Sequence, residues 1–293
     1  MHSFMAGFLF TIFSAIFWGL SSACGQYLLD IKKVSAEWLV VVRLLASGIF
    51  LFFLALKNQK RDIFLIFSDK KDFFILIFYA IFGLFLCQYT YFLSIKLSNA
   101  AIATILQYTS PAFIMIYMAV INKKFPTKLE ILSLFLVMGG VFILATHLKF
   151  DFAIPKEAIV FGLISALCIL VYSITPININ KKYGILTTLS YGLIIGGILA
   201  ALINKNWIYY GVKDIDGLFA IFGTVFFGTI ISFSFYMKGL SILGPTKTSL
   251  LAAVEPVASA FFIYMFLGQR YVFLDYIGFI MILSCTILLA RRK

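Results

Sequence analysis

Long apolar stretches recur ten times in this chain of 293 residues. An α-helix rises about 1.5 Å per residue, so roughly 20 apolar residues cross the hydrocarbon core of a bilayer. The stretches do not alternate apolar and polar residues with period two, which argues against an outer-membrane barrel. The sequence therefore predicts an all-α integral membrane protein with ten transmembrane helices. The expected spans are Phe4–Leu29, Ala36–Leu56, Phe73–Ile95, Ala100–Ile121, Leu129–His147, Ala158–Ile177, Leu186–Ile203, Leu218–Lys238, Thr246–Leu267 and Phe273–Ala290.

The composition excludes a water-soluble domain, because 62% of the residues are hydrophobic and only 12% are charged. The net charge of +12 does not indicate nucleic acid, since the basic residues lie in short loops beside apolar spans. We therefore expect the lipid bilayer and a small-molecule substrate as partners, and no nucleic acid.

The distribution of Lys and Arg predicts the orientation in the membrane. With the N-terminus inside, fifteen of the 24 basic residues lie on the cytoplasmic side, eight lie outside, and Arg43 lies within a span. Cytoplasmic loops carry the excess of positive charge, so we expect both termini in the cytoplasm and the chain in the cytoplasmic membrane. The first apolar run is too long for a signal peptide and lacks a basic region before it, so we expect a retained span. The connection 57–72 mixes charges with Phe and Ile, which predicts a short interfacial helix.

The stretch Gly244–Gly268 contains an acid, Glu255, followed by Pro256, close to the middle of the ninth span. A carboxylate at that depth costs a few kcal/mol at least, so it should face protein or water rather than lipid. A proline there leaves a carbonyl one turn earlier without its amide partner. Two costly features at one depth predict a cavity. The earlier stretch Asn99–Asn122 repeats the pattern, with Ser110 and Pro111 at the matching positions.

An internal repeat follows from this match, because Pro111 and Pro256 are 145 residues apart and a further span follows each run. The chain is predicted to divide near Phe150–Pro155 into two units, 1–150 and 151–293. Each unit would hold five spans, and since five is odd, the two units must be inverted relative to each other. Inverted repeats form their binding site near the midplane, between the halves.

These features resemble the drug/metabolite transporter superfamily, and within it the EamA-like permeases. The resemblance covers nearly the whole chain, but each motif is short. It implies ten helices in two inverted five-helix repeats and transport of small metabolites, often amino acids or their relatives, commonly outward. The family often has an acid after Leu267-Gly268, where this chain has Gln269. The residues that carry the resemblance are Phe17-Trp18-Gly19, Arg43-Leu44-Leu45, Pro111, Leu251–Val257, Leu267-Gly268 and Gly278.

Glu255 is the first candidate for the binding site. One interpretation is a carboxylate that binds a proton, another cation or a substrate ammonium group, because acids within the membrane are functional by default. The alternative is a structural acid that caps the carbonyls freed by Pro256 or pairs with a neighbouring helix. Protons are therefore candidate coupling ions.

Two basic residues have two interpretations each. Arg43 lies about two turns into the second span and either binds a substrate carboxylate or extends outward to the interface or into a structural pair, which is the favoured alternative. Lys247, near the cytoplasmic end of the ninth span, is expected to extend to the interface; a role in a cytoplasmic vestibule is the alternative.

Polar and aromatic side chains at membrane depth are candidates for a cavity lining or for ordinary interhelical packing. Gln107 and Tyr108 are favoured because they lie three or four residues before Pro111. Pro111 and Pro256 are expected to kink their helices and so to act conformationally. The remaining candidates are Trp18, Gln88, Tyr89, Tyr91 and Tyr172.

Several other features give weak or negative signals. Gly192 and Gly196 form a close-packing motif that fits either an intrachain neighbour or a homodimer, so monomer and homodimer both stay open. The cysteines are widely spaced and lie in apolar runs, and His2 and His147 are isolated, so no metal, disulfide or cofactor is expected.

The sequence thus predicts a secondary transporter that moves amino acids or related metabolites by alternating access, with export as the expected direction. An uptake carrier or a multidrug efflux permease of the same fold is the alternative. The chain has no Walker A motif, so ATP hydrolysis is not expected. An integral membrane enzyme is the alternative of another class; we find no paired carboxylates or G-x-S-x-G motif for it. A channel or a purely structural bundle fits poorly with an inverted repeat.

Overall fold

The structure, a computed structural model, describes residues 2–98, 100–148, 154–203 and 212–290, with the side chains of residues 2, 100 and 101 left aside. These residues form helices and connecting turns and no strand. Ten helical segments are long and apolar enough to cross a membrane, and each overlaps one predicted span. The predicted boundary at residues 150 and 151, and the basic residues Lys149, Lys205, Arg291, Arg292 and Lys293 used for orientation, lie outside the described residues.

The helices of the first five spans are α1 (His2–Gln26), α2 (Ala36–Gln59), α3 (Lys70–Phe78), α4 (Leu86–Leu97), α5 (Ala100–Gln107), α6 (Ser110–Asn122) and α7 (Lys128–Thr146). Those of the last five are α8 (Lys156–Ile174), α9 (Pro176–Tyr183), α10 (Ile185–Ile203), α11 (Ile215–Phe222), α12 (Ser232–Leu243), α13 (Pro245–Ala252), α14 (Glu255–Leu267) and α15 (Phe273–Ala290). Short π-helical segments, Tyr27–Ile31, Tyr79–Phe85 and Gly223–Ile231, continue or join these helices, and a 3₁₀ helix occupies Lys60–Phe67 where the sequence predicted an interfacial helix.

Local sequence signals begin these helices. Ser35 accepts a hydrogen bond from the Trp38 amide at the start of α2. Asp69 and Asp214 do the same for α3 and α11. Such side chains satisfy amides that the first turn of a helix leaves without partners.

The fourth and ninth spans are each broken into two helices, where the sequence predicted a kink. The break follows Gln107 in one span and Ala252 in the other, and a proline stands in the first turn of the helix after each break. Proline has no amide to donate and is tolerated in the first turn, so it starts a new helix rather than bending an old one. The helix bounds in the two broken spans coincide at an offset of 145 residues, and each span has a helix of 8 residues followed by one of 13.

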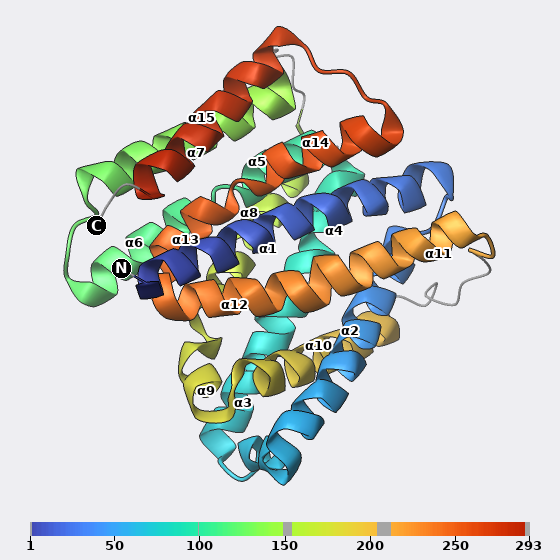
Figure 1. The fold of residues 1–293 in the computed structure, drawn as a ribbon, viewed down its shortest axis with the longest axis vertical. Coiled ribbons are helices and arrows are strands. Elements are labelled where there is room, and N and C mark those ends of the chain that lie inside the picture. The colour runs from blue at the N-terminus through green and yellow to red at the C-terminus, as the bar shows by residue number, and fades with distance from the viewer. Residues whose placement is uncertain (1, 99, 149–153, 204–211, 291–293) are drawn as a thin grey trace.

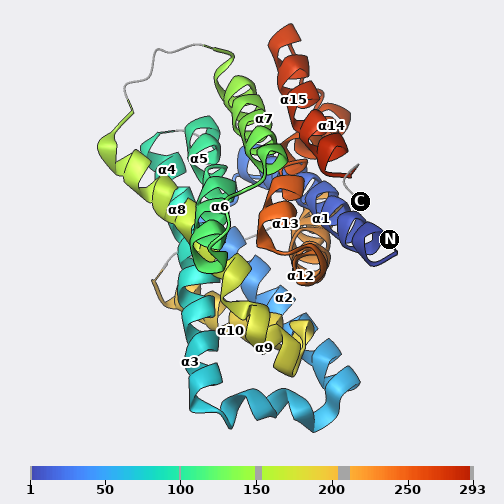
Figure 2. The ribbon, with the colours of Figure 1, turned by 90° about the vertical axis from the view of Figure 1, so that its left-hand side faces the viewer.

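The spans pack in matched pairs. The second span packs against the seventh, α2 on α10, and the fifth against the tenth, α7 on α15, at opposite ends of the view in Figure 1. The first span packs on the eighth and ninth, and the sixth packs on the third and fourth. The repeat relates these two packings: the sixth span corresponds to the first, and the third and fourth correspond to the eighth and ninth. Figure 2 shows α1 beside α12 and α13 on one side and α8 beside α4 and α6 on the other.

Glycines let several of these helices approach closely. A Cβ on Gly140 of α7 would lie 2.8 Å from the Gly278 carbonyl oxygen of α15. Gly192 and Gly196 of α10 face Tyr79, Ala80 and Phe85 of the third span. This intrachain neighbour accounts for the close-packing motif, which therefore gives no evidence for a dimer.

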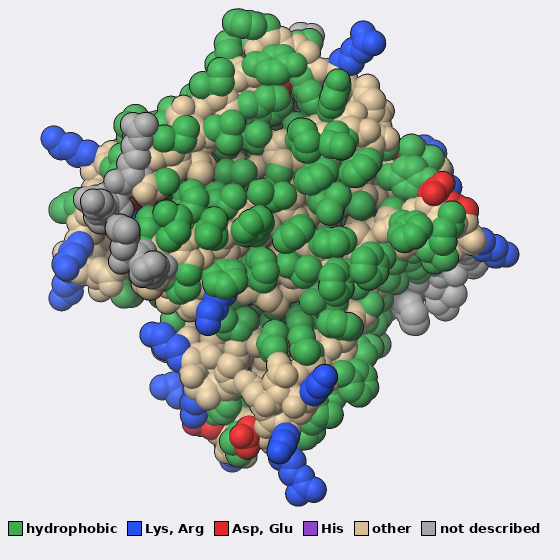
Figure 3. Space-filling view, in the orientation of Figure 1, with side chains coloured by type: hydrophobic (Ala, Val, Ile, Leu, Met, Phe, Trp, Pro, Cys, Tyr) green, Lys and Arg blue, Asp and Glu red, His purple; other side chains and the backbone are tan. Residues whose placement is uncertain are grey.

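The outer surface is apolar over a broad band. Figure 3 shows hydrophobic side chains over most of the visible face, with Lys and Arg side chains at its margins. Exposed residues of this kind include Phe53, Phe74, Val120, Leu202 and Phe219. A surface of this kind suits acyl chains rather than water.

Candidate functional site

A cavity of about 730 Å³ lies between the two sets of five spans. Its deep part is formed around the two helix breaks, by Tyr108, Ser110, Pro111, Ala252 and Glu255. Toward the other end it passes Gln26 and Asp30 of the first span, Ile95 of the third, and Gln269 after the ninth. Asp30 and Gln269 are exposed. The cavity therefore opens at the end of the molecule that carries the connection between the first two spans, opposite the N-terminus of α1.

Glu255 and Tyr108 join the two broken spans inside this cavity. The Tyr108 hydroxyl donates a hydrogen bond to Glu255 Oε2 over 3.1 Å. Glu255 is the first residue of α14, where the amide ends of the helix favour a negative charge. The carboxylate also interacts electrostatically with the Arg43 guanidinium. Glu255 thus faces protein and the cavity rather than lipid, and the cavity is large enough for a ligand.

Arg43 lines the cavity and is bonded to Thr229, which fits a structural pair or a substrate site rather than extension to the interface. Arg43 Nε donates to the Thr229 hydroxyl over 3.3 Å, which ties the second span to the eighth. Thr229 in turn donates to the Thr224 carbonyl. The guanidinium is therefore fixed in place and supplies the cavity with a positive charge.

The amides are held differently from each other. Gln107 lines the cavity, and its Nε2 donates to Ser165 Oγ of α8 over 2.9 Å. This hydrogen bond joins two helices, so Nε2 already has a partner within the protein. Gln88 lines the cavity beside Arg43 and Phe233. Tyr91 also lines it, and its hydroxyl lies 3.0 Å from Thr104 Oγ1.

Four aromatic rings form one wall of the cavity. Trp18 lies edge-on to Phe233 with ring centroids 5.3 Å apart, and 5.2 Å from Tyr236. Tyr172 lies 5.8 Å from both Phe233 and Tyr236. Aromatic faces of this kind attract cations and pack against apolar side chains.

Three residues singled out in the sequence lie elsewhere. Pro256 is one residue from Glu255 but does not line the cavity. Tyr89 stacks on Phe85, with ring centroids 5.6 Å apart. Lys247 Nζ lies 5.5 Å from the centre of the Phe4 ring at the end that carries the N-terminus.

Other lining residues are hard to identify from the sequence alone. Ser110 appeared only as the counterpart of Glu255, and Gln269 only as a departure from the family pattern, yet both line the cavity. The chain has 34 Phe and 15 Tyr, so nothing in the sequence distinguishes Phe233 and Tyr236 from aromatic residues that only pack between helices. Cys87 lines the cavity too, although its thiol also approaches Ser165.

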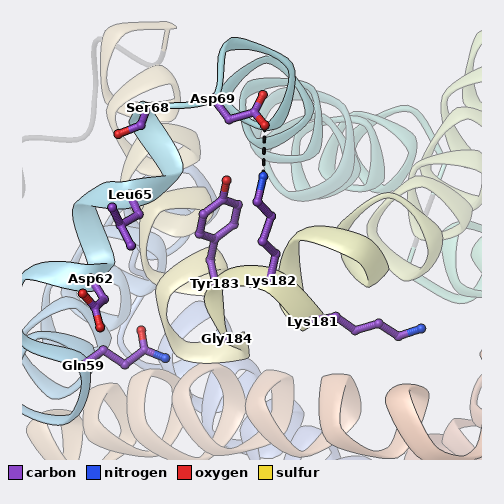
Figure 4. Close-up of a pocket in the computed structure, with 9 residues that line it drawn as sticks. All are labelled: Gln59, Asp62, Leu65, Ser68, Asp69, Lys181, Lys182, Tyr183 and Gly184. Atoms are coloured by element: carbon purple, nitrogen blue, oxygen red, sulfur yellow. Dashed lines mark hydrogen bonds and ion pairs between the residues drawn. The ribbon is translucent and has the colours of Figure 1, made fainter.

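A second hollow, of about 700 Å³, lies at the opposite end of the molecule, beside the connection between the second and third spans. Figure 4 shows the residues that line it. There Lys182 Nζ contacts Asp69 Oδ2 at 3.0 Å and Asp72 Oδ2 at 2.5 Å. Tyr183 donates to the same oxygen of Asp72 over 2.7 Å. The Lys182 ammonium and the amides of Asp72 and Lys71 hold the pKa of Asp69 below its ordinary value. These contacts join the start of the third span to the end of the sixth span.

A similar ion pair lies at the end where the main cavity opens. Lys32 Nζ lies 2.7 Å from Asp214 Oδ2, and Asp214 begins α11 as Asp69 begins α3. The hydrogen bond from Lys32 and the Gly217 amide hold the pKa of Asp214 below its ordinary value.

His147, expected to be isolated, pairs with Asp275. Their Nε2 and Oδ1 atoms are 2.7 Å apart, and the Asp275 side chain is largely buried. Asp275 also accepts from the Val272 amide at the start of α15. The pair joins the end of α7 to the beginning of α15, away from the main cavity. Among the described residues, no three His, Cys, Asp or Glu side chains are grouped to hold a metal.

Comparison with known proteins agrees with this architecture. The model of the EamA-like transporter family matches twice, over residues 5–146 and 156–291. An uncharacterised inner membrane transporter, YicL of Salmonella typhimurium, is 31% identical over 298 residues, covering 100% of this chain and 99% of the relative. An uncharacterised transporter, YcbK of Bacillus subtilis, is 23% identical over 217 residues, covering 70% of this chain and 66% of the relative.

A solved structure shows the same fold. A crystal structure of a protein superposes with a TM-score of 0.77 at 15% identity, covering 97% of this chain and 96% of the other. At that identity the likeness concerns the fold alone. The twofold family match extends over nearly the whole chain, and the ten spans surround a cavity open at one end. The chain belongs to the EamA-like transporter family and is a multi-pass membrane transporter.

Proposed function

We propose that this chain is a secondary transporter that exports amino acids or related metabolites across the cytoplasmic membrane by alternating access. The observation that carries the proposal is the Tyr108–Glu255 hydrogen bond, which joins the two broken spans inside a cavity open at one end. Broken helices of this kind bring backbone polar groups and helix ends into a binding site at membrane depth.

The charges of the cavity favour a substrate with an ammonium group. Glu255 supplies a negative charge beside the aromatic wall of Trp18, Tyr172, Phe233 and Tyr236, and both features attract a cation. Arg43 supplies a positive charge in the same space, which suits a carboxylate. A zwitterion with an apolar side chain suits all three features: its ammonium group suits Glu255, its carboxylate suits Arg43, and its side chain suits the aromatic wall.

Alternating access requires two related halves of opposite orientation, which we propose are the units 1–150 and 151–293. Support comes from the exchange of packing partners between spans five apart and from the matched breaks at Tyr108 and Ala253. With the N-terminus in the cytoplasm, the cavity faces outward and the contacts of Lys182, Asp69 and Asp72 lie at the closed cytoplasmic end. The YicL relative, named as an inner membrane transporter, supports the cytoplasmic membrane as the location.

Counterflow in proteoliposomes tests the proposal. Vesicles loaded with an unlabelled amino acid should accumulate the labelled one transiently, with a rate that saturates. Glu255→Gln should reduce this accumulation, whereas Glu37→Gln, at an exposed position outside the cavity, should leave it unchanged. Flux that rises linearly with concentration would indicate a channel.

The aromatic wall beside one carboxylate also favours a second candidate, efflux of apolar organic cations. Tetraphenylphosphonium carries a delocalised positive charge and no carboxylate, so it separates the two candidates. Saturable binding of tetraphenylphosphonium, with no binding of any amino acid, would support drug efflux and contradict the amino-acid assignment.

A further inference from the structure

The two helix breaks are equivalent in position but differ in charge. Ser110 begins α6 and Glu255 begins α14; each is followed by proline, and each lines the cavity. In the second half the acid faces the positive end of its own helix. In the first half a neutral hydroxyl stands at that position, so nothing at the first residue neutralises the positive end of α6.

The start of α6 also lacks a side-chain cap. The residue before it, Thr109, donates its hydroxyl to the Leu106 carbonyl over 2.6 Å, and only its carbonyl accepts from amides of α6, those of Ala112 and Phe113. Ser110 lines the cavity although only 5% of its surface is exposed, and the structure shows no hydrogen bond from its hydroxyl to another described residue. A ligand or water in the cavity can supply a partner for this hydroxyl.

The two breaks lie close to each other across the cavity. Tyr108, two residues before Ser110, reaches Glu255 Oε2 with its hydroxyl at 3.1 Å. A ligand that bridges the two breaks would need a negative group for Ser110 and a positive group for Glu255, as an α-amino acid has.

We propose that Ser110 and the amino-terminal end of α6 form an anion subsite that binds the substrate carboxylate, opposite the ammonium subsite at Glu255. This inference rests on the proposed function and deepens it: the two breaks make the cavity select zwitterions, and Ser110 determines the selection for the anionic group. A carboxylate there accepts from the Ser110 hydroxyl and meets the favourable field of the helix end. Arg43 adds a longer-range attraction for the same charge.

Three probes with one side chain test the proposal: L-phenylalanine, phenethylamine, which lacks the carboxylate, and 3-phenylpropionate, which lacks the ammonium. Binding is measured on the purified full chain, by thermal shift and by radioligand binding. The wild-type protein should bind L-phenylalanine most tightly. Ser110→Ala should weaken binding of L-phenylalanine about tenfold, the effect of one hydrogen bond to a charged group, and leave phenethylamine unchanged.

Charge exchange between the breaks gives a second, stronger test. Ser110→Glu should reverse the preference in favour of phenethylamine, because two acids then face the ligand. The double variant Ser110→Glu with Glu255→Ser should restore the preference for L-phenylalanine, since the two breaks have exchanged their roles. Size-exclusion profile and melting temperature show whether each variant is folded, and Ser110→Ala decides the matter should the charged variants fail to fold.

Two contrary results are distinguishable. If the wild type binds L-phenylalanine and Ser110→Ala weakens all three probes equally, or none, the anion subsite is overturned while the transporter proposal stands. If the wild type binds none of the three probes, the amino-acid assignment and the subsite fall together.

Discussion

Glu255 and Tyr108 show what a single side chain contributes to this cavity. The carboxylate is the only acid at the helix breaks among the described residues, and the phenol of the opposite half orients it. Both were predicted as site residues from the cost of an acid at membrane depth and from proximity to Pro111. Their hydrogen bond was not predictable, because it joins residues 147 apart in sequence.

We expect Tyr108→Phe to raise the half-saturating concentration of an ammonium-bearing substrate about tenfold, because a hydrogen bond to a charged group contributes about 1.5–3 kcal/mol. Concentration-dependent counterflow measures it. Tyr89→Phe is the matched control, since Tyr89 stacks on Phe85 outside the cavity. Equal effects of the two changes would mean that the Tyr108 hydroxyl has no special role.

We expect Glu255→Gln to remove the pH dependence of transport. The amide keeps the size of the side chain but can neither take up nor release a proton. Transport by the wild type and by Glu255→Gln is measured over a series of pH values at constant membrane potential. A pH profile that Glu255→Gln leaves intact would rule out a role for this carboxylate in proton coupling.

Arg43 marks the limit of sequence reasoning at this scale. Its distance from the end of the span favours either an extended side chain at the interface or a structural pair, and depth in the span does not separate the two. The structure turns it inward because Thr229, on a span almost two hundred residues later, offers an acceptor. Ser110 was passed over for the opposite reason: a serine in a membrane helix is common, and only the neighbouring break makes its hydroxyl notable.

At the scale of helices, the sequence predicts the membrane spans well and their internal irregularities poorly. Hydropathy and length located all ten spans, because the bilayer fixes the length of an apolar helix. The interior of the spans was predicted less well. Prolines 111 and 256 indicated an irregularity but not that two residues leave the helix at each site. Nothing in the sequence indicated the π-helical segments, which depend on how neighbouring helices pack.

The crossing of α7 and α15 gives a prediction at this scale. Gly140→Ala places a methyl group 2.8 Å from the Gly278 carbonyl oxygen, and relieving that overlap should cost roughly 1–3 kcal/mol. The melting temperature of the purified protein should fall. Gly25→Ala is the control, because a Cβ there meets nothing within 4 Å and alanine favours helix. A lower melting temperature for Gly25→Ala than for Gly140→Ala would contradict the packing argument.

At the scale of the whole molecule, the ion pairs at the two ends are related by the repeat. Asp69 and Asp214 are 145 residues apart; each begins a helix of the third or eighth span and pairs with a lysine of the other half. Because this pair is present at both the open and the closed end, it should persist in either state of the transporter. The contacts of Asp72 with Lys182 and Tyr183 are present only at the closed end, and the residue 145 positions after Asp72 is Gly217, which has no side chain to replace them.

In the proposed orientation the contacts of Asp72 should therefore favour the outward-open state, whereas the pair of Asp69 should be neutral between states. A contact network of this kind contributes about 1 kcal/mol, or roughly a fivefold change in the ratio of states. Cys87 reports the state, because it lines the cavity. With Cys24, Cys168 and Cys285 replaced by alanine, a membrane-impermeant thiol reagent added from the outside should label Cys87 more slowly in Asp72→Asn, by about fivefold at most.

The same reagent added to inside-out vesicles should label Asp72→Asn faster than the parent protein, because the cavity then opens more often to the cytoplasm. Asp69→Asn loses one contact of the same lysine and should change neither rate. Equal changes for Asp69→Asn and Asp72→Asn would mean that the cluster merely braces the third span against the sixth. The resting state would then be set elsewhere, by the packing of the two halves around the cavity itself.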